Sequence, residues 1–211
     1  MGLREQNKLK TKKKILAVST ALFVKNGFEN VGIRDIVSKS SISIGTYYNY
    51  FTTKEDIVFA LIDEIVPDLF NKWSSENMEK QASDVTGIIT LVFKLHFDIF
   101  SKKIFIVKEF FNIVTNPNLV MKNSLYKDKI SEYKTIFWNF VLEVLIKNNI
   151  NPNPHNYENL KSFFWAIYIT SVYYWIQDTS PKKQNTFAYL KTTLDTFLYG
   201  VTDSCISLNR N

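Results

Sequence analysis

The sequence predicts an all-α protein, and three observations support this prediction. Apolar residues recur three and four positions apart through most of the chain, and no stretch alternates apolar and polar residues as a strand would. Only six glycines and five prolines occur in 211 residues, which disfavours a turn-rich all-β fold. Hydrophobic residues make up 45% of the chain, so a sizeable core can be buried.

The first helix is predicted over residues 6–26. Ile15, Val18 and Leu22 recur at helical spacing, and Gly27 follows as a C-terminal capping glycine. A second, short helix, "IRDIVSKS", is expected to start after Gly32.

The third helix is predicted within "SISIGTYYNYF", residues 41–51, with Ser43 as its N-cap. A helical wheel places one group of its residues inward, namely Tyr47, Phe51, Ile44 and Tyr50, and another group outward, namely Gly45, Thr46, Tyr48 and Asn49. The two faces therefore have different chemistry.

A fourth helix should begin at Thr53, where "TKED" resembles a capping box with Asp56 in the third position. Pro67 is expected to kink this helix or to end its first segment. The remaining helices are predicted over 84–101, 103–114, 120–148, 156–178 and 184–204, with loops in "TNPN", "NNINPNPHN" and "DTSPKKQN".

Positive charge is concentrated at the N-terminus. Residues 1–60 hold ten Lys or Arg and five Asp or Glu, which is +5 of the chain's net +6. This distribution indicates a head that binds a polyanion, although a solvated lysine-rich tail explains it equally well.

The outward face of the third helix has groups that suit duplex DNA. Asn49 can pair with an adenine edge, Thr46 can contact a base, and the Tyr48 hydroxyl can reach a phosphate. Gly45 permits close approach of the backbone. Two helices joined by "SKSSIS" fit a helix-turn-helix, and an ordinary helical hairpin with a polar surface remains the alternative.

Residues 15–62 resemble the DNA-binding head of the TetR family of bacterial transcription regulators. The resemblance rests on these motifs in order: Leu22-Phe23, Gly27-Phe28, Asp35-Ile36-Val37, Gly45-Thr46-Tyr47-Tyr48-Asn49-Tyr50-Phe51 and Thr53-Lys54-Glu55. The other 150 or so residues match only in length and in being helical.

The resemblance implies a role for each matching residue. Tyr48 and Lys54 would hold phosphates, Tyr50 would flank the DNA backbone, and Ser43, Ile44, Gly45, Thr46 and Asn49 would face the groove, with Arg34 completing the DNA-binding set. The sequence departs from the family at Gly32, where a capping Thr is usual, and at Ser41, which replaces a turn glycine and needs a positive φ.

We therefore divide the chain into a helix-turn-helix domain at 1–52, with a basic extension at 1–14, and a helical domain at 53–211. The resemblance implies that the last two helices form a homodimer interface, to which we assign Phe164, Trp175, Phe187, Leu194, Phe197 and Val201. A monomeric helical core is the alternative.

The resemblance also implies an effector pocket in the C-terminal domain. The candidate lining is mainly aromatic and comprises His96, Phe97, Phe100, Phe110, Phe137, Trp138, Trp165 and Tyr168. Pockets are apolar with few polar groups, but so are ordinary cores. The absence of an obvious buried cation suggests a neutral or mainly apolar effector.

Catalysis, cofactors and metals are not indicated. Only His96, His155 and the single cysteine Cys205 are present, so a Cys/His zinc cluster cannot be assembled. Neither a P-loop nor a dinucleotide fingerprint occurs. The charged N-terminus has no signal-peptide pattern, so we expect a cytoplasmic protein that does not enter the membrane.

The sequence thus predicts a dimeric repressor that binds a pseudo-palindromic double-stranded DNA operator and is released by a small molecule. The alternatives are a regulator without a releasing effector, a small-molecule-binding protein or enzyme that retains the head, and a peripheral membrane role for the basic N-terminus. The operator, the regulated genes, the effector and the sign of regulation are not specified by the sequence.

Overall fold

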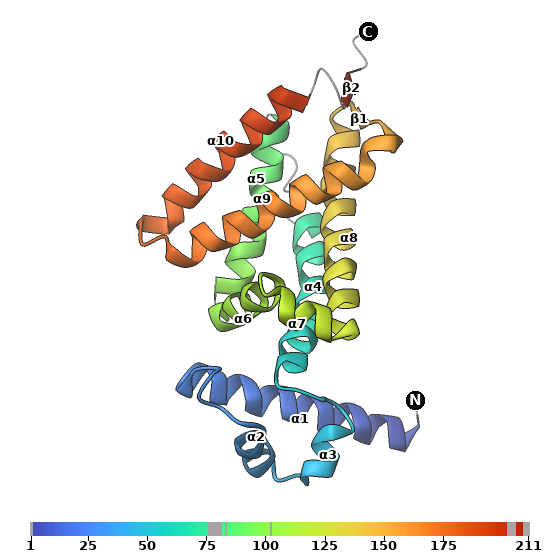
Figure 1. Cartoon of the computed structure of the whole chain (residues 1–211), viewed down its shortest axis with the longest axis vertical. Coiled ribbons are helices and arrows are strands. Elements are labelled where there is room, and N and C mark those ends of the chain that lie inside the picture. The colour runs from blue at the N-terminus through green and yellow to red at the C-terminus, as the bar shows by residue number, and fades with distance from the viewer. Residues whose placement is uncertain (1, 76–81, 83, 102, 202–205, 209–211) are drawn as a thin grey trace. The chain divides into compact units, whose positions relative to one another are not determined.

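The structure is a computed structural model that describes residues 2–75, 82, 84–101, 103–201 and 206–208 (Figure 1). Its helices are α1 (Leu3–Asn26), α2 (Ile33–Ser40), α3 (Ile44–Tyr48), α4 (Glu55–Ser75), α5 (Val85–Ser101), α6 (Ile104–Val114), α7 (Pro117–Lys122), α8 (Ser124–Lys147), α9 (Tyr157–Gln177) and α10 (Gln184–Val201). The expected all-α fold is confirmed. Cys205 lies outside the described residues.

The chain divides into two compact units. The first comprises Met1–Asp68 with Lys102–Asn112, and the second comprises Leu69–Ser101 with Ile113–Asn211. The sequence boundary at residue 52 differs from this division because the start of α4 and most of α6 pack with the head. Phe59 of α4 lies 6.2 Å from Phe110 of α6, and Phe23 of α1 lies 5.7 Å from Phe105 of α6, measured between ring centroids.

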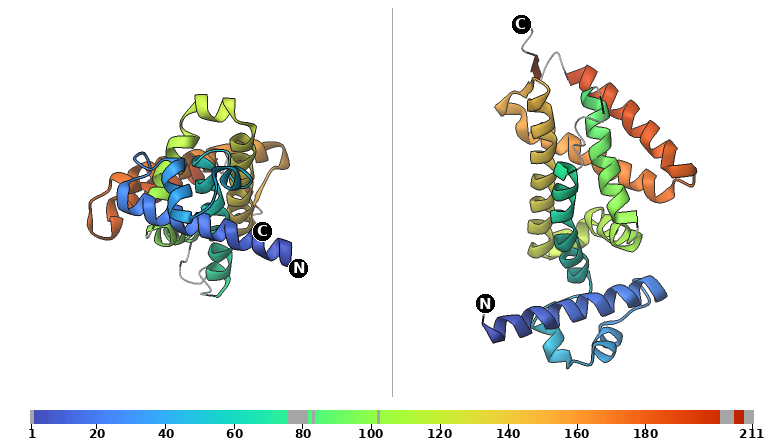
Figure 2. Two further views of the ribbon diagram at one scale, coloured as in Figure 1. Left: turned by 90° about the horizontal axis from the view of Figure 1, so that it is seen from below. Right: turned by 180° about the vertical axis from the view of Figure 1, so that it is seen from behind.

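In the first unit, α1 crosses α2 and α3, as two views of the ribbon show (Figure 2). The buried stripe of α1, including Ile15, Leu16 and Phe23, follows from the predicted helical periodicity. Gly27 ends α1 with φ of 82°, a backbone conformation that side chains rarely adopt, and its N–H donates to the Phe23 carbonyl at 3.0 Å. The capping role predicted for Gly27 is confirmed.

α4 continues through Pro67, so its first segment does not end there, and the expected alternative of a kink stays a prediction. One expectation about helix ends was wrong. The single helix expected over 120–148 is two helices, because Asn116 and Asn123 each accept backbone N–H groups and so begin α7 and α8 separately.

Two short strands were not predicted. Ile150–Pro152 forms β1, which pairs antiparallel with β2 at Ile206–Leu208. Each is only three residues long, too short for an alternating pattern to be recognised in the sequence. Short 3₁₀ turns at Pro154–Asn156 and Pro181–Lys183 lie within the other segments predicted as loops.

The second unit packs α5, α8, α9 and α10 around an aromatic core (Figures 1 and 2). α10 contacts both α5 and α9, and α8 contacts both α5 and α9. Phe93 and Phe164 are fully buried in this core. The loop before α10 is fixed by Asp178, whose carboxylate accepts the backbone N–H and the hydroxyl of both Ser180 and Thr186.

Candidate nucleic-acid interface

The turn between α2 and α3 gives the head its helix-turn-helix form. α2 ends at Ser40, and Ser41 has the left-handed conformation with φ of 51° and ψ of 48°. The positive φ predicted for this serine is confirmed. At the other end of α2 the capping threonine of the family is missing, and the Asp35 carboxylate accepts the Gly32 N–H at 2.8 Å instead.

α3 is fixed to the head by one tyrosine. Tyr47 is fully buried, and its hydroxyl donates to the Thr53 carbonyl at 2.9 Å, which ties α3 to the segment before α4. Ser43 caps the helix as predicted, accepting the Thr46 N–H at 3.0 Å. Its hydroxyl also bonds to the Thr46 hydroxyl at 2.8 Å, so this threonine is held in one orientation.

The segment after α3 is held by the predicted capping box. The Asp56 carboxylate accepts the N–H groups of Thr52 and Thr53 at 2.7 and 2.9 Å, and the Thr53 hydroxyl accepts the Asp56 N–H at 3.2 Å. These bonds fix the carbonyl of Thr53 that receives the Tyr47 hydroxyl. The start of α4 therefore positions α3.

The exposed face of α3 is larger and more apolar than the wheel predicted. Tyr48 is 52% exposed, as predicted, but Ile44 is 47% exposed and its inward placement was wrong. The wheel treated residues 44–51 as one helix, whereas α3 has five residues and ends at Tyr48. Phe51 is buried, but it lies after the end of α3. The helical wheel therefore does not relate the direction of the Phe51 side chain to that of Ile44.

Gly45 lies on this exposed face with open space before it. A methyl group built on its Cα would meet only the Ser43 hydroxyl, at 3.9 Å, which is an ordinary contact. Neither steric crowding nor a positive φ requires glycine here. A bound molecule that approaches the backbone closely would give this position a reason to lack a side chain.

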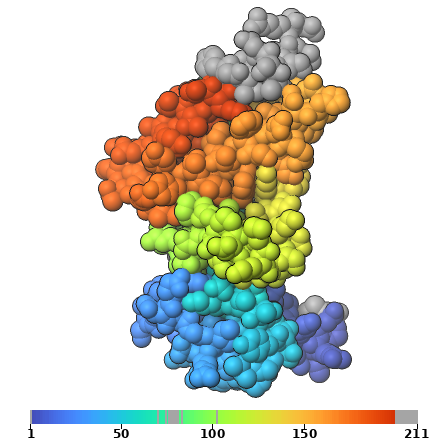
Figure 3. Space-filling model, in the orientation of Figure 1, coloured from blue at the N-terminus to red at the C-terminus, as the bar shows by residue number. Residues whose placement is uncertain are grey.

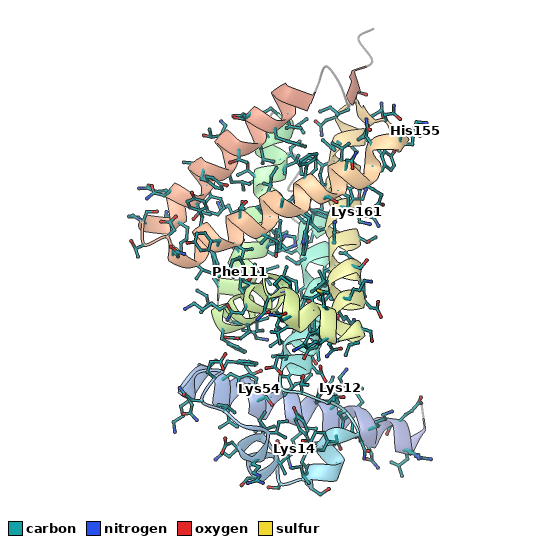
Figure 4. All side chains as sticks on the ribbon, in the orientation of Figure 1. Lys12, Lys14, Lys54, Phe111, His155 and Lys161 are labelled. Carbon is teal, nitrogen blue, oxygen red and sulfur yellow. The ribbon has the colours of Figure 1, made fainter. Side chains whose placement is uncertain are left out.

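Lys54 is directed into the head. Its ammonium group donates to the Phe28 carbonyl at 2.9 Å, with weaker contacts to the Val31 and Glu29 carbonyls at 3.4 and 3.5 Å. It also lies 4.4 Å from the centre of the Phe28 ring. In this structure the lysine, labelled in Figure 4, joins the α1–α2 turn to the segment before α4, and its side chain is only 19% exposed, unlike that of a lysine displayed for a phosphate.

The head also displays basic side chains on α1 and α2. Arg34 on α2 is exposed, as is Asn49, while Tyr50 is half-buried after the end of α3. On α1, a basic group of Lys8, Lys10, Lys12, Lys13 and Lys14 is exposed, and within the described chain none of these lysines makes an ion pair. Figure 4 labels Lys12 and Lys14, which helical geometry directs to different sides of α1.

The residues predicted to line a ligand pocket fall into separate places. His96, Phe137, Trp165 and Tyr168 lie together, with Phe137 and Tyr168 at 4.9 Å between ring centroids. The others belong elsewhere: Phe97 stacks on Trp175 at 5.1 Å, Trp138 contacts Tyr157 and Phe164, Phe100 is buried, and Phe110 belongs to the first unit beside Phe59.

The predicted dimer residues are largely internal. Phe164, Trp175 and Leu194 are at most 3% exposed within a single chain, so they offer almost no surface to a partner in this structure. Phe187 and Phe197 are half-buried, and the side chain of Val201 lies outside the described part. Hydrophobicity alone does not distinguish a core-facing side of a helix from a partner-facing side.

Only Phe197 of the predicted dimer residues lines the exposed groove on α9 and α10. A groove of about 540 Å³ runs between the two helices, lined by Phe163, Ala166, Ile167, Thr170, Tyr189, Thr192, Thr193, Thr196 and Phe197. Phe163 is 56% exposed, and the neighbouring Tyr173 and Tyr174 are 47% and 46% exposed. Figure 3 shows α9 in orange and α10 in red side by side on the visible face.

No described helix has the length and hydropathy needed to cross a membrane. Within the same residues, no group of three or more His, Cys, Asp or Glu side chains could hold a metal ion.

Comparison with known proteins places the head in a known group. Residues 15–61 match the family model of bacterial regulatory proteins of the tetR family, and residues 162–198 match the COQ9 family model. The transcriptional regulator LuxR of Vibrio harveyi is 30% identical over 71 residues, which are 34% of each chain. The match thus spans about a third of that relative.

Solved structures share the fold of the whole chain. FadR of Thermus thermophilus, a TetR-family transcriptional repressor in complex with lauroyl-CoA, has a TM-score of 0.68 at 16% identity, covering 90% of this chain and 94% of its own. The TetR transcriptional regulator of Nitrosomonas europaea has a TM-score of 0.63 at 14% identity, covering 89% and 98%. At these identities the likeness concerns the fold.

Proposed function

We propose that this chain, whose head belongs to the tetR family of bacterial regulatory proteins, regulates transcription as a dimer that binds an operator through α3 and releases it on binding a small molecule. The observation that carries the proposal is the exposed face of α3. Tyr48, Ile44 and Asn49 are displayed on a helix whose opposite side is locked by the buried Tyr47.

The chemistry of this face supports major-groove binding. The Asn49 amide can pair with adenine, Ile44 can contact a thymine methyl group, and the Tyr48 hydroxyl can reach a phosphate. Gly45 leaves room for the DNA at the start of the helix. The unpaired basic group of α1 adds phosphate contacts and makes the affinity fall with salt.

For Lys54 we propose a positioning role. Its ammonium holds the α1–α2 turn through three carbonyls, so the head keeps α3 in place whether or not DNA is bound. The side chains proposed to touch DNA are thus those of Arg34, Ser43, Ile44, Thr46, Tyr48, Asn49 and Tyr50, with the backbone of Gly45.

The groove between α9 and α10 supports dimerisation. The exposed Phe163 lines the groove with several threonines, and the exposed Tyr174 stacks at 4.0 Å on Tyr189 of the groove, and such aromatic surface is costly in water. A second copy of the chain would cover this face in a two-fold arrangement. Two heads related by that axis would require an operator with two-fold symmetry.

An effector role is supported by the aromatic cluster around Tyr168 and by a fold neighbour. The solved FadR of Thermus thermophilus, whose fold is similar, is in complex with lauroyl-CoA, a ligand with an apolar acyl chain on a charged coenzyme A group. Of the two signs of regulation, we propose repression, which a ligand would relieve by releasing the protein from DNA. Unchanged DNA affinity across a screen of apolar compounds would instead favour an effector-independent regulator.

Fluorescence anisotropy with the DNA upstream of the protein's own gene tests the proposal. Wild type should bind in a sequence-selective, salt-sensitive way, and Tyr48→Ala should weaken binding by at least tenfold. Met121→Ala is the matched control, because Met121 is also a large exposed side chain, 85% accessible, but lies in α7 outside the head. Equal losses for both variants, or none for either, would contradict the role of α3.

A further inference from the structure

Two polar side chains interrupt the aromatic cluster of the second unit. His96 comes from α5 and Tyr168 from α9, and their rings lie 5.8 Å apart between centroids in a T-shaped arrangement. Phe93 and Phe137 each lie within 6 Å of Tyr168, and Trp165 stacks on it at 5.4 Å. The two polar groups therefore have aromatic walls on several sides.

The orientation of the imidazole follows from one hydrogen bond. His96 Nδ1 lies 2.9 Å from the Val92 carbonyl oxygen. A carbonyl can only accept, so Nδ1 carries a proton and donates it. Burial lowers the pKa of His96, which keeps the ring neutral near pH 7. The remaining nitrogen, Nε2, is then a hydrogen-bond acceptor with its lone pair available.

Two polar atoms of this pair, His96 Nε2 and the Tyr168 hydroxyl, have no protein partner among the described residues. The Tyr168 hydroxyl makes no hydrogen bond there, and His96 makes only the bond through Nδ1. In the described chain, the inaccessible side-chain polar atoms without a partner are the hydroxyls of Ser19, Ser40 and Ser171. His96 Nε2 and the Tyr168 hydroxyl are not in this group. Both side chains keep accessible surface, since each is half-buried.

This accessible surface lies among aromatic rings of the unit. Phe137 lies 6.2 Å from His96 and 4.9 Å from Tyr168, and Phe93 and Trp165 flank Tyr168 at 5.7 and 5.4 Å, all measured between ring centroids, so protein surrounds the pair. A side chain that is enclosed by protein and still accessible faces an internal space. The wall of that space offers an acceptor at His96, a donor at Tyr168 and otherwise aromatic rings.

We infer that His96 and Tyr168 bind the hydroxyl group of a neutral aromatic ligand, which donates to His96 Nε2 and accepts from the Tyr168 hydroxyl. Planar rings pack well against Phe137 and Trp165 in offset or edge-to-face contact. A neutral imidazole offers no counter-charge, so a carboxylate would enter less well. The inference rests on the proposed function for its regulatory meaning and gives the effector a chemical class.

Equilibrium dialysis of the full chain with 1-naphthol, naphthalene and 1-naphthoate tests this inference. Wild type should bind 1-naphthol about tenfold more tightly than naphthalene, the effect of satisfying a hydrogen bond in a buried site, and should bind 1-naphthoate more weakly than 1-naphthol. Tyr168→Phe should reduce the affinity for 1-naphthol about tenfold while leaving that for naphthalene unchanged.

Tyr157→Phe provides the matched control. Tyr157 is also a half-buried tyrosine of α9, but its ring contacts Trp138 and not His96 or Tyr168. The Tyr157→Phe variant should therefore bind 1-naphthol with the affinity of wild type. Circular dichroism shows whether each variant is folded. Equal binding of 1-naphthol and naphthalene, tighter binding of 1-naphthoate, an unaffected Tyr168→Phe, or no binding of 1-naphthol up to its solubility would overturn the inference.

DNA anisotropy on the same samples separates the two proposals. If 1-naphthol binds through Tyr168 and DNA affinity does not change, the ligand site stands and release by an effector fails. If no DNA binds at all, the regulatory function fails while the dialysis result still decides the ligand site.

Discussion

Replacing Lys54 with methionine distinguishes a lysine that holds the head together from one that holds DNA. Methionine keeps most of the apolar stem and removes the ammonium group. The lost interactions are the 2.9 Å bond to the Phe28 carbonyl, two longer contacts to carbonyls, and the position 4.4 Å from the Phe28 ring. The 3.9 Å contact with Glu29 is to a carboxylate that is 80% exposed, and it contributes little.

The magnitude follows from these contacts. A hydrogen bond from a charged donor contributes about 1.5–3 kcal/mol, and a cation over an aromatic ring at a partly exposed site contributes about 0.5–1 kcal/mol. The Lys54 side chain is 19% exposed, so solvent replaces part of what is lost. We expect Lys54→Met to lower the free energy of unfolding of the head by about 2 kcal/mol.

Amide hydrogen exchange is the suitable assay, because all four tryptophans (Trp73, Trp138, Trp165 and Trp175) lie in the second unit and do not report on the head. Protected amides of α1 and α2 should exchange about thirtyfold faster, the factor that corresponds to 2 kcal/mol. Lys25→Met, at an exposed lysine in the last turn of α1, should change exchange little.

The salt dependence of DNA binding distinguishes a phosphate-binding role of Lys54 from a positioning role. If Lys54 holds a phosphate, its removal lowers the slope of log affinity against log salt by about 0.9 and leaves exchange unchanged. If it positions the turn, the slope is unchanged and exchange accelerates. An unchanged exchange rate with a reduced slope would refute the reasoning.

Three further predictions concern single residues. Gly45→Ala should keep or raise the stability of the head, by up to about 1 kcal/mol on helix propensity, but reduce DNA affinity at least tenfold, because the methyl group enters only the space left for DNA; unaffected anisotropy would contradict this. Ser40→Ala should stabilise the head by about 1 kcal/mol in exchange measurements, since it removes a buried hydroxyl without a partner. Asp178→Asn should lower the melting temperature. Hydrogen bonds from Ser180 and Thr186 lower the pKa of Asp178, so its contribution is present above the ordinary aspartate pKa near 4 and is lost as pH falls through the lower folded pKa; wild type and variant that differ equally at pH 7 and pH 2 would contradict this.

The head could be predicted closely because its signals are local. The Ser43 cap, the positive φ of Ser41 and the capping box at Asp56 each follow from residue types within a few positions of one another. The same locality accounts for the error at Ile44, since nothing near it indicates that α3 ends after five residues.

The second unit was harder to predict because its signals are not local. Phe163 and Phe164 are neighbours of identical type, yet one is 56% exposed and the other fully buried. Only the packing of α9 against α8 and α10 separates them. Likewise, the inward direction of Lys54 depends on carbonyls some 25 residues earlier in the chain, which the α1–α2 turn brings to it.

Selection of bound fragments from the genomic DNA of the source organism, followed by sequencing, tests the central claim most directly. A dimer that reads DNA through two copies of α3 should enrich an inverted repeat whose half-sites are centred about one helical turn, roughly 10 base pairs, apart. The repeat should disappear from the fragments bound by Tyr48→Ala. Fragments without a common sequence, or the same sequence recovered by wild type and Tyr48→Ala, would contradict the account.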